Sequence, residues 1–236
     1  MLSVVIPCYN EAFRLEPLFR LIDSQAALGW EWVLVDDGSA DRTGQALAEF
    51  ARRSPARVHA LSHERNLGKG AAVRTGVLAT TGDMVGYVDA DLAASPLDFA
   101  PYLAEPDLQG GRALLVGIRL LTQERRVQRH PLRHLIGRLY LTYVSCLTGL
   151  TVYDTQCGFK LLSGGRAREL FSRLGCRGFA FDAELILRAL AAGMSIREVP
   201  VAWQEQGRSR VRPTSAARMF VDILAMRARL AREARG

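Results

Sequence analysis

The sequence has 236 residues, of which 49% are hydrophobic, and this is enough for one substantial core. The formal net charge is +7, and arginine supplies all of the positive charge except Lys69 and Lys160, which indicates an anionic partner. Four cysteines lie far apart without a C-x-x-C pair, which argues against a zinc knuckle, a redox dithiol and a disulfide framework.

Apolar runs rich in valine and isoleucine alternate with helical patterns along the first half of the chain. This alternation predicts an α/β fold with a Rossmann-like, mostly parallel central sheet flanked by helices. The predicted strands are 2–7, 31–37, 57–63, 84–90 and 113–119. The predicted helices are 12–28, 41–53, 68–80, 96–104, 131–149, 164–173, 181–192 and 213–232. We expect one main domain over 1–212 and a basic amphipathic helix over 213–236.

Polar clusters follow four of the predicted strands. They are PCYNE at 7–11, DDGSAD at 36–41, HERNLGKG at 63–70 and DADL at 89–92. In an open α/β sheet the carboxyl ends of the strands line the ligand crevice. The four clusters are therefore expected to meet at one site.

The segment NLGKGAAVRTG at 66–76 suggests phosphate binding, but it does not match two common fingerprints. A P-loop needs glycine at position 63, where this chain has histidine, and Ser or Thr at position 70, where it has glycine. A dinucleotide fingerprint needs glycines directly after the first strand, and none is present there. What remains is a glycine loop that opens a helix, whose backbone N–H groups and Lys69 can meet a diphosphate.

Asp89 and Asp91 stand at the end of a buried strand. Both carboxylates can approach one divalent cation as the chain turns. Mg²⁺ or Mn²⁺ suits such a pair, because these ions take one or two carboxylates and complete their shell with phosphate oxygens and water. The alternative is a solvated turn that caps the next helix, and the neighbouring motifs favour the metal.

Four motifs in the first 120 residues resemble those of inverting glycosyltransferases of family 2, in their order and spacing. They are VVIPCYNE at 4–11, VLVDDGSADRT at 33–43, NLGKGAAVRTG at 66–76 and VDADL at 88–92. Later segments resemble the branch that glycosylates polyprenyl phosphates, in particular the dolichyl-phosphate β-glucosyltransferases. These segments are DTQCGFKLL at 154–162, FAFDAELILRA at 179–189, IREVPVAW at 196–203 and GRSRV at 207–211. The resemblance implies the GT-A fold and transfer of glucose from UDP-glucose to a polyprenyl or dolichyl phosphate.

The resemblance also implies a nucleotide-sugar site and a metal site. The nucleotide-sugar site would contain Pro7, Tyr9, Asn10, Glu11, Asp36, Asp37, Gly68, Lys69, Asp89 and Ala90. Asp36 or Asp37 would hydrogen-bond the base, and Asp91 would be the main metal ligand with Asp89 beside it. Related mannose synthases have a glutamine two residues after the second aspartate, whereas this chain has Ala93, which argues against a mannose synthase.

An acceptor phosphate would need cations rather than a strong base. With a second pKa of about 6, a phosphate monoester is mostly an anionic nucleophile at neutral pH. The resemblance implies four arginines around it: Arg119, Arg133, Arg208 and Arg210. Asp182 or Glu184 could supply a base, or these two acids could simply open a helix at 181 and complement its dipole. Asp154 is expected to orient an arginine.

The expected location is the cytoplasm, peripheral at the inner face of the membrane. The chain begins without a signal-peptide pattern, and its longest uncharged run, 139–153, is shorter than the roughly 20 apolar residues of a spanning helix. Two segments, 130–150 and the helix from Pro213, combine apolar and basic residues and are expected to dock on the membrane surface. The helix would present Met219, Phe220, Ile223, Leu224 and Leu230, flanked by Arg218, Arg227, Arg229, Arg232 and Arg235.

Other readings of the same features stay open. The apolar stripe of the last helix could pack on the catalytic domain or on a second subunit, so a homodimer is one alternative. A non-catalytic nucleotide-sugar-binding module and a transferase acting on a saccharide or a diglyceride are others. Nucleic-acid binding is not expected, because the arginines come without stacking aromatics, zinc spacing or a recognition helix.

Overall fold

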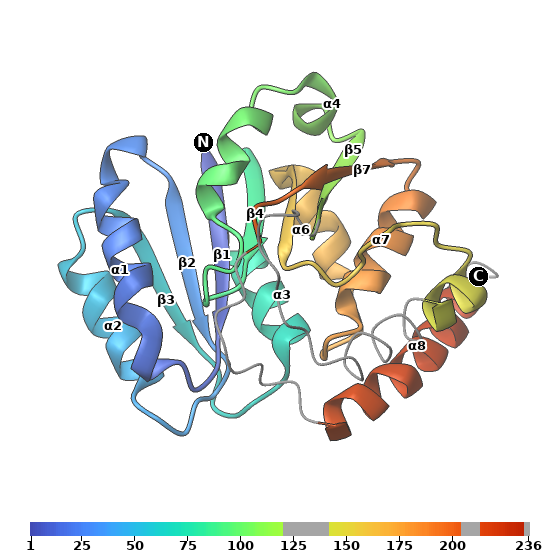
Figure 1. Ribbon diagram of the computed structural model, residues 1–236, viewed down its shortest axis with the longest axis horizontal. Coiled ribbons are helices and arrows are strands. Elements are labelled where there is room, and N and C mark those ends of the chain that lie inside the picture. The colour runs from blue at the N-terminus through green and yellow to red at the C-terminus, as the bar shows by residue number, and fades with distance from the viewer. Residues whose placement is uncertain (120–141, 204–212, 234–236) are drawn as a thin grey trace.

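The computed structural model describes residues 1–119, 142–203 and 213–233. Within these ranges, seven strands form one mixed sheet in the order β3-β2-β1-β4-β6-β5-β7, with helices on both faces (Figure 1). The predicted α/β class is confirmed. No helix in the described ranges is long and apolar enough to cross a membrane.

The first half of the chain forms the parallel part of the sheet. Its strands are β1 (Leu2–Cys8), β2 (Glu31–Asp36), β3 (Arg57–Ser62) and β4 (Met84–Val88), and its helices are α1 (Leu15–Ser24), α2 (Thr43–Arg53) and α3 (Lys69–Ala79). β1 pairs in parallel with both β2 and β4, so it lies at the centre of this half. Every residue of β2 is buried, because helices cover both faces of the sheet and the strand needs no polar side.

The second half adds β5 (Ala113–Ile118), β6 (Phe159–Ser163) and β7 (Ser195–Pro200). β6 runs antiparallel between β4 and β5. β6 and β7 were not among the predicted strands. A lysine stands inside the buried β6. Among the described strands β7 pairs only with β5, and Val199 is its one buried residue, so neither β6 nor β7 has a clear apolar pattern.

The remaining helices are α4 (Pro106–Gln109), α6 (Gly164–Ser172), α7 (Phe181–Ala191) and α8 (Pro213–Glu233). The predicted helix 12–28 is divided into the 3-10 turn η1 (Ala12–Arg14), α1 and the 3-10 turn η2 (Ala26–Leu28). The predicted helix 96–104 is instead the 3-10 segment η3 (Pro96–Tyr102), which contains Pro101, a residue that cannot donate a helical hydrogen bond. Of the predicted helix 131–149, only 142–149 is described, and residues 142–148 are helical.

One face of α8 packs on the rest of the described structure. Its Ile223 and Met226 are fully buried in the apolar cluster that also contains Tyr87 and Phe181. Leu224, expected on the same stripe, is 52% exposed instead. The predicted apolar stripe is thus divided. Its buried residues pack on the domain, which was the alternative to membrane docking. The side chains of Arg218 and Met219, and the whole of Arg235, lie outside the described part of the chain.

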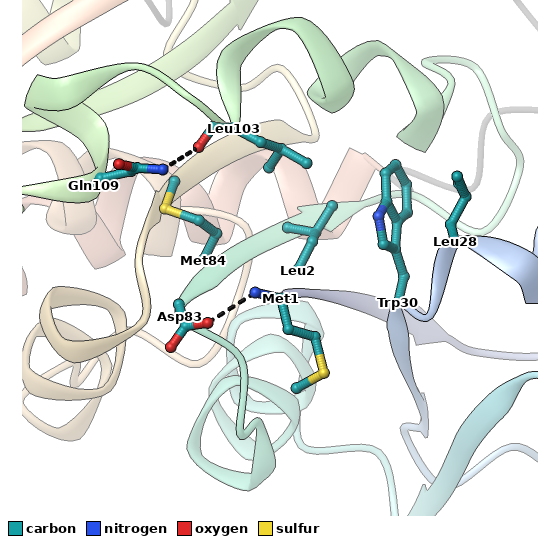
Figure 2. A pocket seen from close by; sticks show the side chains of 8 residues that line it. All are labelled: Met1, Leu2, Leu28, Trp30, Asp83, Met84, Leu103 and Gln109. Atoms are coloured by element: carbon teal, nitrogen blue, oxygen red, sulfur yellow. Dashed lines mark hydrogen bonds and ion pairs between the residues drawn. The ribbon is translucent and has the colours of Figure 1, made fainter.

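A cavity of about 390 Å³ lies at the amino ends of β1 and β4 (Figure 2). Its lining is largely apolar and includes Leu2, Trp30, Met84 and Leu103. Because Leu2 and Met84 begin their strands, this cavity lies at the edge of the sheet opposite to the polar clusters.

Candidate active site

The structure brings the strand-end clusters together through hydrogen bonds between their loops. The Asn10 N–H group donates to Ser39 Oγ at 2.8 Å, and Asn10 Oδ1 accepts from the Ala40 N–H group at 2.8 Å. The Glu11 N–H group donates to Thr43 Oγ1 at 2.7 Å. The loop after β1 is therefore tied to the loop after β2, and Tyr9, which is 41% exposed, lies between these bonds and β1.

Two residues of these loops have an unusual backbone conformation. Among the described residues other than glycine, a positive φ occurs at Asn10 (53°) and at Leu92 (54°). Such left-handed conformations cost energy for most residues, and they gather at functional sites where the surrounding structure holds them. Here Asn10 turns the chain at the end of the PCYN segment, and Leu92 turns it directly after the DAD segment, which supports a functional role for both loops.

Lys69 joins the glycine loop to the DAD segment. Its Nζ lies 2.6 Å from Oδ1 of Asp89, and it begins α3 directly after Gly68, which has a φ of +104°. Burial by itself would lower the pKa of Lys69, but the carboxylates of Asp89, Asp182 and Asp91 together raise it above its usual value. Lys69 is therefore a firmly charged cation at the carboxyl edge of the sheet.

Asp91 stands in a region of concentrated negative charge. Burial and the neighbouring Asp89 raise its pKa above the usual value, while the N–H group of Ala93 and the cations of Arg14 and Lys69 lower it in part. Its Oδ1 accepts from the Ala93 N–H group at 3.0 Å. A carboxylate whose charge is destabilised by burial and by a neighbouring carboxylate is suited to bind a divalent cation.

The carboxylates present fit a metal that the substrate helps to hold. Within the described ranges, no three or more His, Cys, Asp or Glu side chains gather as a complete metal site. Asp89 and Asp91 would therefore supply two oxygen ligands, and substrate phosphates with water would supply the others, as is usual for Mg²⁺ and Mn²⁺. Gly158 lies close to Asp89, since a Cβ atom at the position of Gly158 would lie 2.3 Å from Oδ2 of Asp89.

Asp37, one of two candidates for base recognition, holds the glycine loop. Its Oδ1 accepts from the Leu67 N–H group at 2.9 Å, and its Oδ2 accepts from the Gly68 N–H group at 2.8 Å. The ring of His63 lies 2.8 Å from the same carboxylate. Asp37 is only 3% exposed, so its observed role is to fix the loop that carries Lys69.

Asp36 is likewise buried, and Ser39 and Ser62 donate to its carboxylate. In the sheet, Asp36 is paired with Cys8, and Pro7 is paired with Val35, the residue before Asp36. Contact of Asp36 or Asp37 with a base stays a prediction, as does the nucleotide contact of Pro7, Tyr9, Asn10, Glu11 and Ala90.

Asp182 is buried in an ion pair. Its Oδ1 lies 2.6 Å from Nζ of Lys160, a lysine with no exposed surface, and the Tyr87 hydroxyl donates to the same oxygen. Lys160 also donates to the carbonyl oxygens of Thr155 and Cys157. A carboxylate with 2% exposure and these partners is poorly placed to take a proton from an acceptor. Asp182 instead connects β4, β6 and α7 beneath the site.

Arg119, directly after β5, is held in one orientation. Asp154 binds it with two contacts, Nε to Oδ2 at 2.6 Å and Nη2 to Oδ1 at 2.9 Å, which confirms that Asp154 orients an arginine. The guanidinium also lies over the ring of Trp203, 5.1 Å from its centroid. Burial would lower the pKa of Arg119, but Asp154 raises it, and Asp89 adds to this effect. Arg133, Arg208 and Arg210 lie outside the described residues.

Several contributors to the site were not predicted. Arg14 donates a hydrogen bond to Glu11. Glu11, and to a smaller extent Asp91 and Asp89, raise the pKa of Arg14, although burial lowers it. Gly158 and Lys160 belong to the CGFK segment, which was noted only as a motif. The one signal in the sequence was a lysine inside an otherwise apolar run, since a buried lysine requires an acidic partner.

A scan against protein families and a search of known proteins agree on one family. The family described as glycosyl transferase family 2 matches residues 3–170. A dolichyl-phosphate beta-glucosyltransferase of Mus musculus is 36% identical over 245 residues, which cover 97% of this chain and 75% of that protein. Another, of Trichomonas vaginalis, is 32% identical over 234 residues, which cover 94% of this chain and 69% of that protein.

Solved structures show the same fold. Glucosyl-3-phosphoglycerate synthase from Mycobacterium tuberculosis has a TM-score of 0.66 at 24% identity, over 97% of this chain and 80% of that one. The same enzyme in complex with Mn²⁺, UDP-glucose and phosphoglyceric acid has a TM-score of 0.65 at 22% identity. The sheet and its flanking helices thus have the GT-A arrangement, and the chain belongs to glycosyl transferase family 2.

Proposed function

We propose that this family 2 glycosyltransferase moves glucose from UDP-glucose to a polyprenyl phosphate such as dolichyl phosphate. The observation that carries the proposal is the pairing of two groups: the Asp89, Asp91 and Lys69 cluster, and Arg119 held by Asp154 within range of Asp89's charge. The first group suits the diphosphate of a nucleotide sugar with its metal, and the second suits an acceptor phosphate. The names of the curated relatives support glucose and dolichyl phosphate as substrates.

The donor would lie across the carboxyl ends of β1, β2 and β4. Asp89 and Asp91 would hold Mg²⁺ or Mn²⁺, which when bound neutralises the charge that builds on the leaving diphosphate. Lys69 would meet the diphosphate from the start of α3, where backbone N–H groups and the helix dipole also favour an anion. A solved relative with Mn²⁺ and UDP-glucose supports this choice of metal and donor.

The acceptor phosphate would be held by Arg119. The bidentate contact with Asp154 fixes the guanidinium, so little conformational entropy is lost when a phosphate binds. One phosphate oxygen would attack the anomeric carbon from the face opposite to UDP, and the bond to the diphosphate oxygen would break with its electron pair. Because the nucleophile is already an anion, no general base is needed, which agrees with the burial of Asp182.

We also propose that the outer face of α8 rests on a membrane surface. Val221 and Leu224 are exposed large apolar residues on that helix, and Arg227 and Arg232 are exposed near them. An apolar strip with flanking arginines suits an interface with anionic lipid. The apolar tail of the proposed polyprenyl acceptor lies in a membrane, so an enzyme that uses it must reach the membrane surface.

Substrate choice can be tested with a panel of UDP-sugars and GDP-sugars. Each is scored first for metal-dependent hydrolysis and then for transfer to a polyprenyl phosphate. UDP-glucose should be the best donor in both assays. Equal use of a GDP-sugar would contradict the proposed donor, and binding without hydrolysis or transfer would favour a non-catalytic module.

A further inference from the structure

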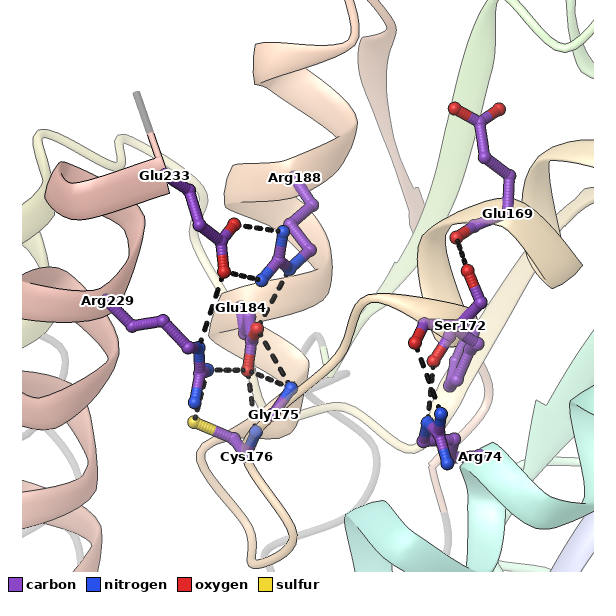
Figure 3. A network of polar contacts seen from close by, with 10 residues as sticks. Arg74, Glu169, Ser172, Gly175, Cys176, Glu184, Arg188, Arg229 and Glu233 are labelled. Carbon is purple, nitrogen blue, oxygen red and sulfur yellow. Dashed lines mark hydrogen bonds and ion pairs between the residues drawn. The ribbon is translucent and has the colours of Figure 1, made fainter. Parts of the chain in front are cut away.

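Glu184, in the first turn of α7, lies at the centre of a polar network that joins α8 to the domain (Figure 3). The carboxylate is completely buried. It accepts from the N–H groups of Gly175 at 3.1 Å and Cys176 at 2.8 Å, and from Arg188 Nε at 2.8 Å. Burial would raise the pKa of Glu184, but these donors hold it below its usual value, so the group stays ionised.

Arg229 of α8 completes this network from the other side. Its Nη2 lies 2.7 Å from Oε2 of Glu184, and Glu233 on the next turn of α8 binds Arg188 at 2.9 Å. The guanidinium of Arg229 lies against Gly175 so closely that a Cβ atom there would be 2.1 Å from Nη1. Arg229 therefore binds the carboxylate and packs closely on the loop at 175–178.

The loop at 175–178 in turn lies against the segment that carries Lys69. The carbonyl oxygen of Arg177 accepts from the Ala71 N–H group at 3.1 Å. A Cβ atom at Gly68 would lie 2.5 Å from that carbonyl oxygen, and one at Gly70 would lie 2.7 Å from the carbonyl oxygen of Cys176. The glycines of the GKG segment thus allow the two backbones to pack closely, and a shift of one loop must move the other.

We infer that Arg229 is a positioning residue for the donor site, which sets the place of Lys69 through Glu184 and the loop at 175–178. The inference rests on the proposed donor site. Each step is a direct contact: Arg229 to Glu184, Glu184 to Cys176, the loop to residues 68–71, and Lys69 to Asp89. It gives α8 a role in the reaction besides any role at a membrane, because the position of this helix is transmitted to the diphosphate-binding lysine.

The test measures UDP binding by calorimetry with Mn²⁺ present, on the full chain. Arg229→Met should raise the dissociation constant for UDP by about two- to thirtyfold, the range for residues that act through a chain of contacts. In transfer assays the same variant should raise the KM for the donor and leave the KM for the lipid acceptor unchanged. Arg20→Met, which removes an exposed arginine paired with Glu16 on α1, is the matched control and should leave the dissociation constant unchanged.

A double variant separates positioning from general damage. In a Lys69→Met background, Arg229→Met should cause no further loss of UDP affinity, because its effect passes through Lys69. A fraction of irreversibly unfolded chains would instead lower the number of binding sites per chain without changing the dissociation constant. If Arg229→Met does not fold, Glu233→Gln provides a milder test from the exposed end of the network and should also weaken UDP binding.

Two outcomes would overturn the inference. Equal dissociation constants for the wild type and Arg229→Met would overturn it and leave the donor site as proposed. Failure of the wild type to bind UDP would overturn the donor site and the inference together.

Discussion

Nζ of Lys69 lies 2.6 Å from Oδ1 of Asp89, and this ion pair joins the glycine loop before α3 to the DAD segment after β4. Asp91 follows two residues later, with a pKa raised by burial and by Asp89. One lysine thus faces two carboxylates at the edge of the sheet where the donor is proposed to bind. The arrangement leads to predictions that separate metal binding, acceptor binding and fold stability.

Asp91→Asn should abolish transfer and leave the fold intact. It removes a carboxylate that is proposed to hold the metal, and the side chain keeps its size and its place at the end of a strand. Titration of Mn²⁺ in the presence of UDP should show that the variant has lost metal-dependent binding. Asp107→Asn, which alters an exposed carboxylate paired with Arg112, is the control and should behave as the wild type does. Full transfer by a chelator-treated Asp91→Asn variant would remove the metal assignment.

Arg119→Ala should weaken use of polyprenyl phosphate far more than it weakens binding of UDP. Charged hydrogen bonds contribute about 1.5 to 3 kcal/mol each, so a loss of about tenfold to a hundredfold in kcat/KM for the acceptor is expected. Arg119→Lys should restore little of the lost kcat/KM for the acceptor, because lysine cannot make the bidentate contact with Asp154. The KM values for acceptor and donor, measured separately, check this, and equal losses in both would place Arg119 at the donor.

Asp182→Ala should mainly lower the stability of the fold, and it should not remove a general base from the transfer reaction. It would leave the fully buried Lys160 without its carboxylate partner, and breaking such a pair costs about 3 to 5 kcal/mol. Replacing both partners, as in Lys160→Met with Asp182→Leu, should destabilise less than the single change. Thermal unfolding measures both. A stable Asp182→Ala protein with an altered pH profile for transfer would restore the assignment of Asp182 as a base.

Membrane docking can be tested without disturbing the core. Deleting α8 would remove the buried Ile223 and Met226, so the better variant is Val221→Ser with Leu224→Ser on the exposed face. Co-sedimentation with vesicles should rise with anionic lipid, fall with salt and drop in this double variant. Equal recovery in the supernatant with and without anionic vesicles would exclude docking through this face.

The parallel half of the fold and the meeting of the strand-end clusters could be predicted because both depend on local patterns. Apolar runs that contain valine mark β1, β2 and β4. Because the carboxyl ends of parallel strands lie at one edge of the sheet, the segments that carry Lys69 and Asp89 were expected to meet there. β6 could not be found in this way, since the charge partner of its buried Lys160 is Asp182, which lies 22 residues away along the chain. The network around Glu184 likewise depends on Arg229. A local sequence pattern cannot predict a pair of residues so far apart along the chain.

Transfer of labelled glucose from UDP-glucose into organic-extractable lipid tests the central claim most directly. With dolichyl phosphate and Mn²⁺ or Mg²⁺ present, the label should move into the lipid phase as a β-linked phosphate ester. It should stay in the aqueous phase with a chelator or with the Asp91→Asn variant. Label that stays in the aqueous phase with the wild-type chain, metal and dolichyl phosphate all present would contradict the account.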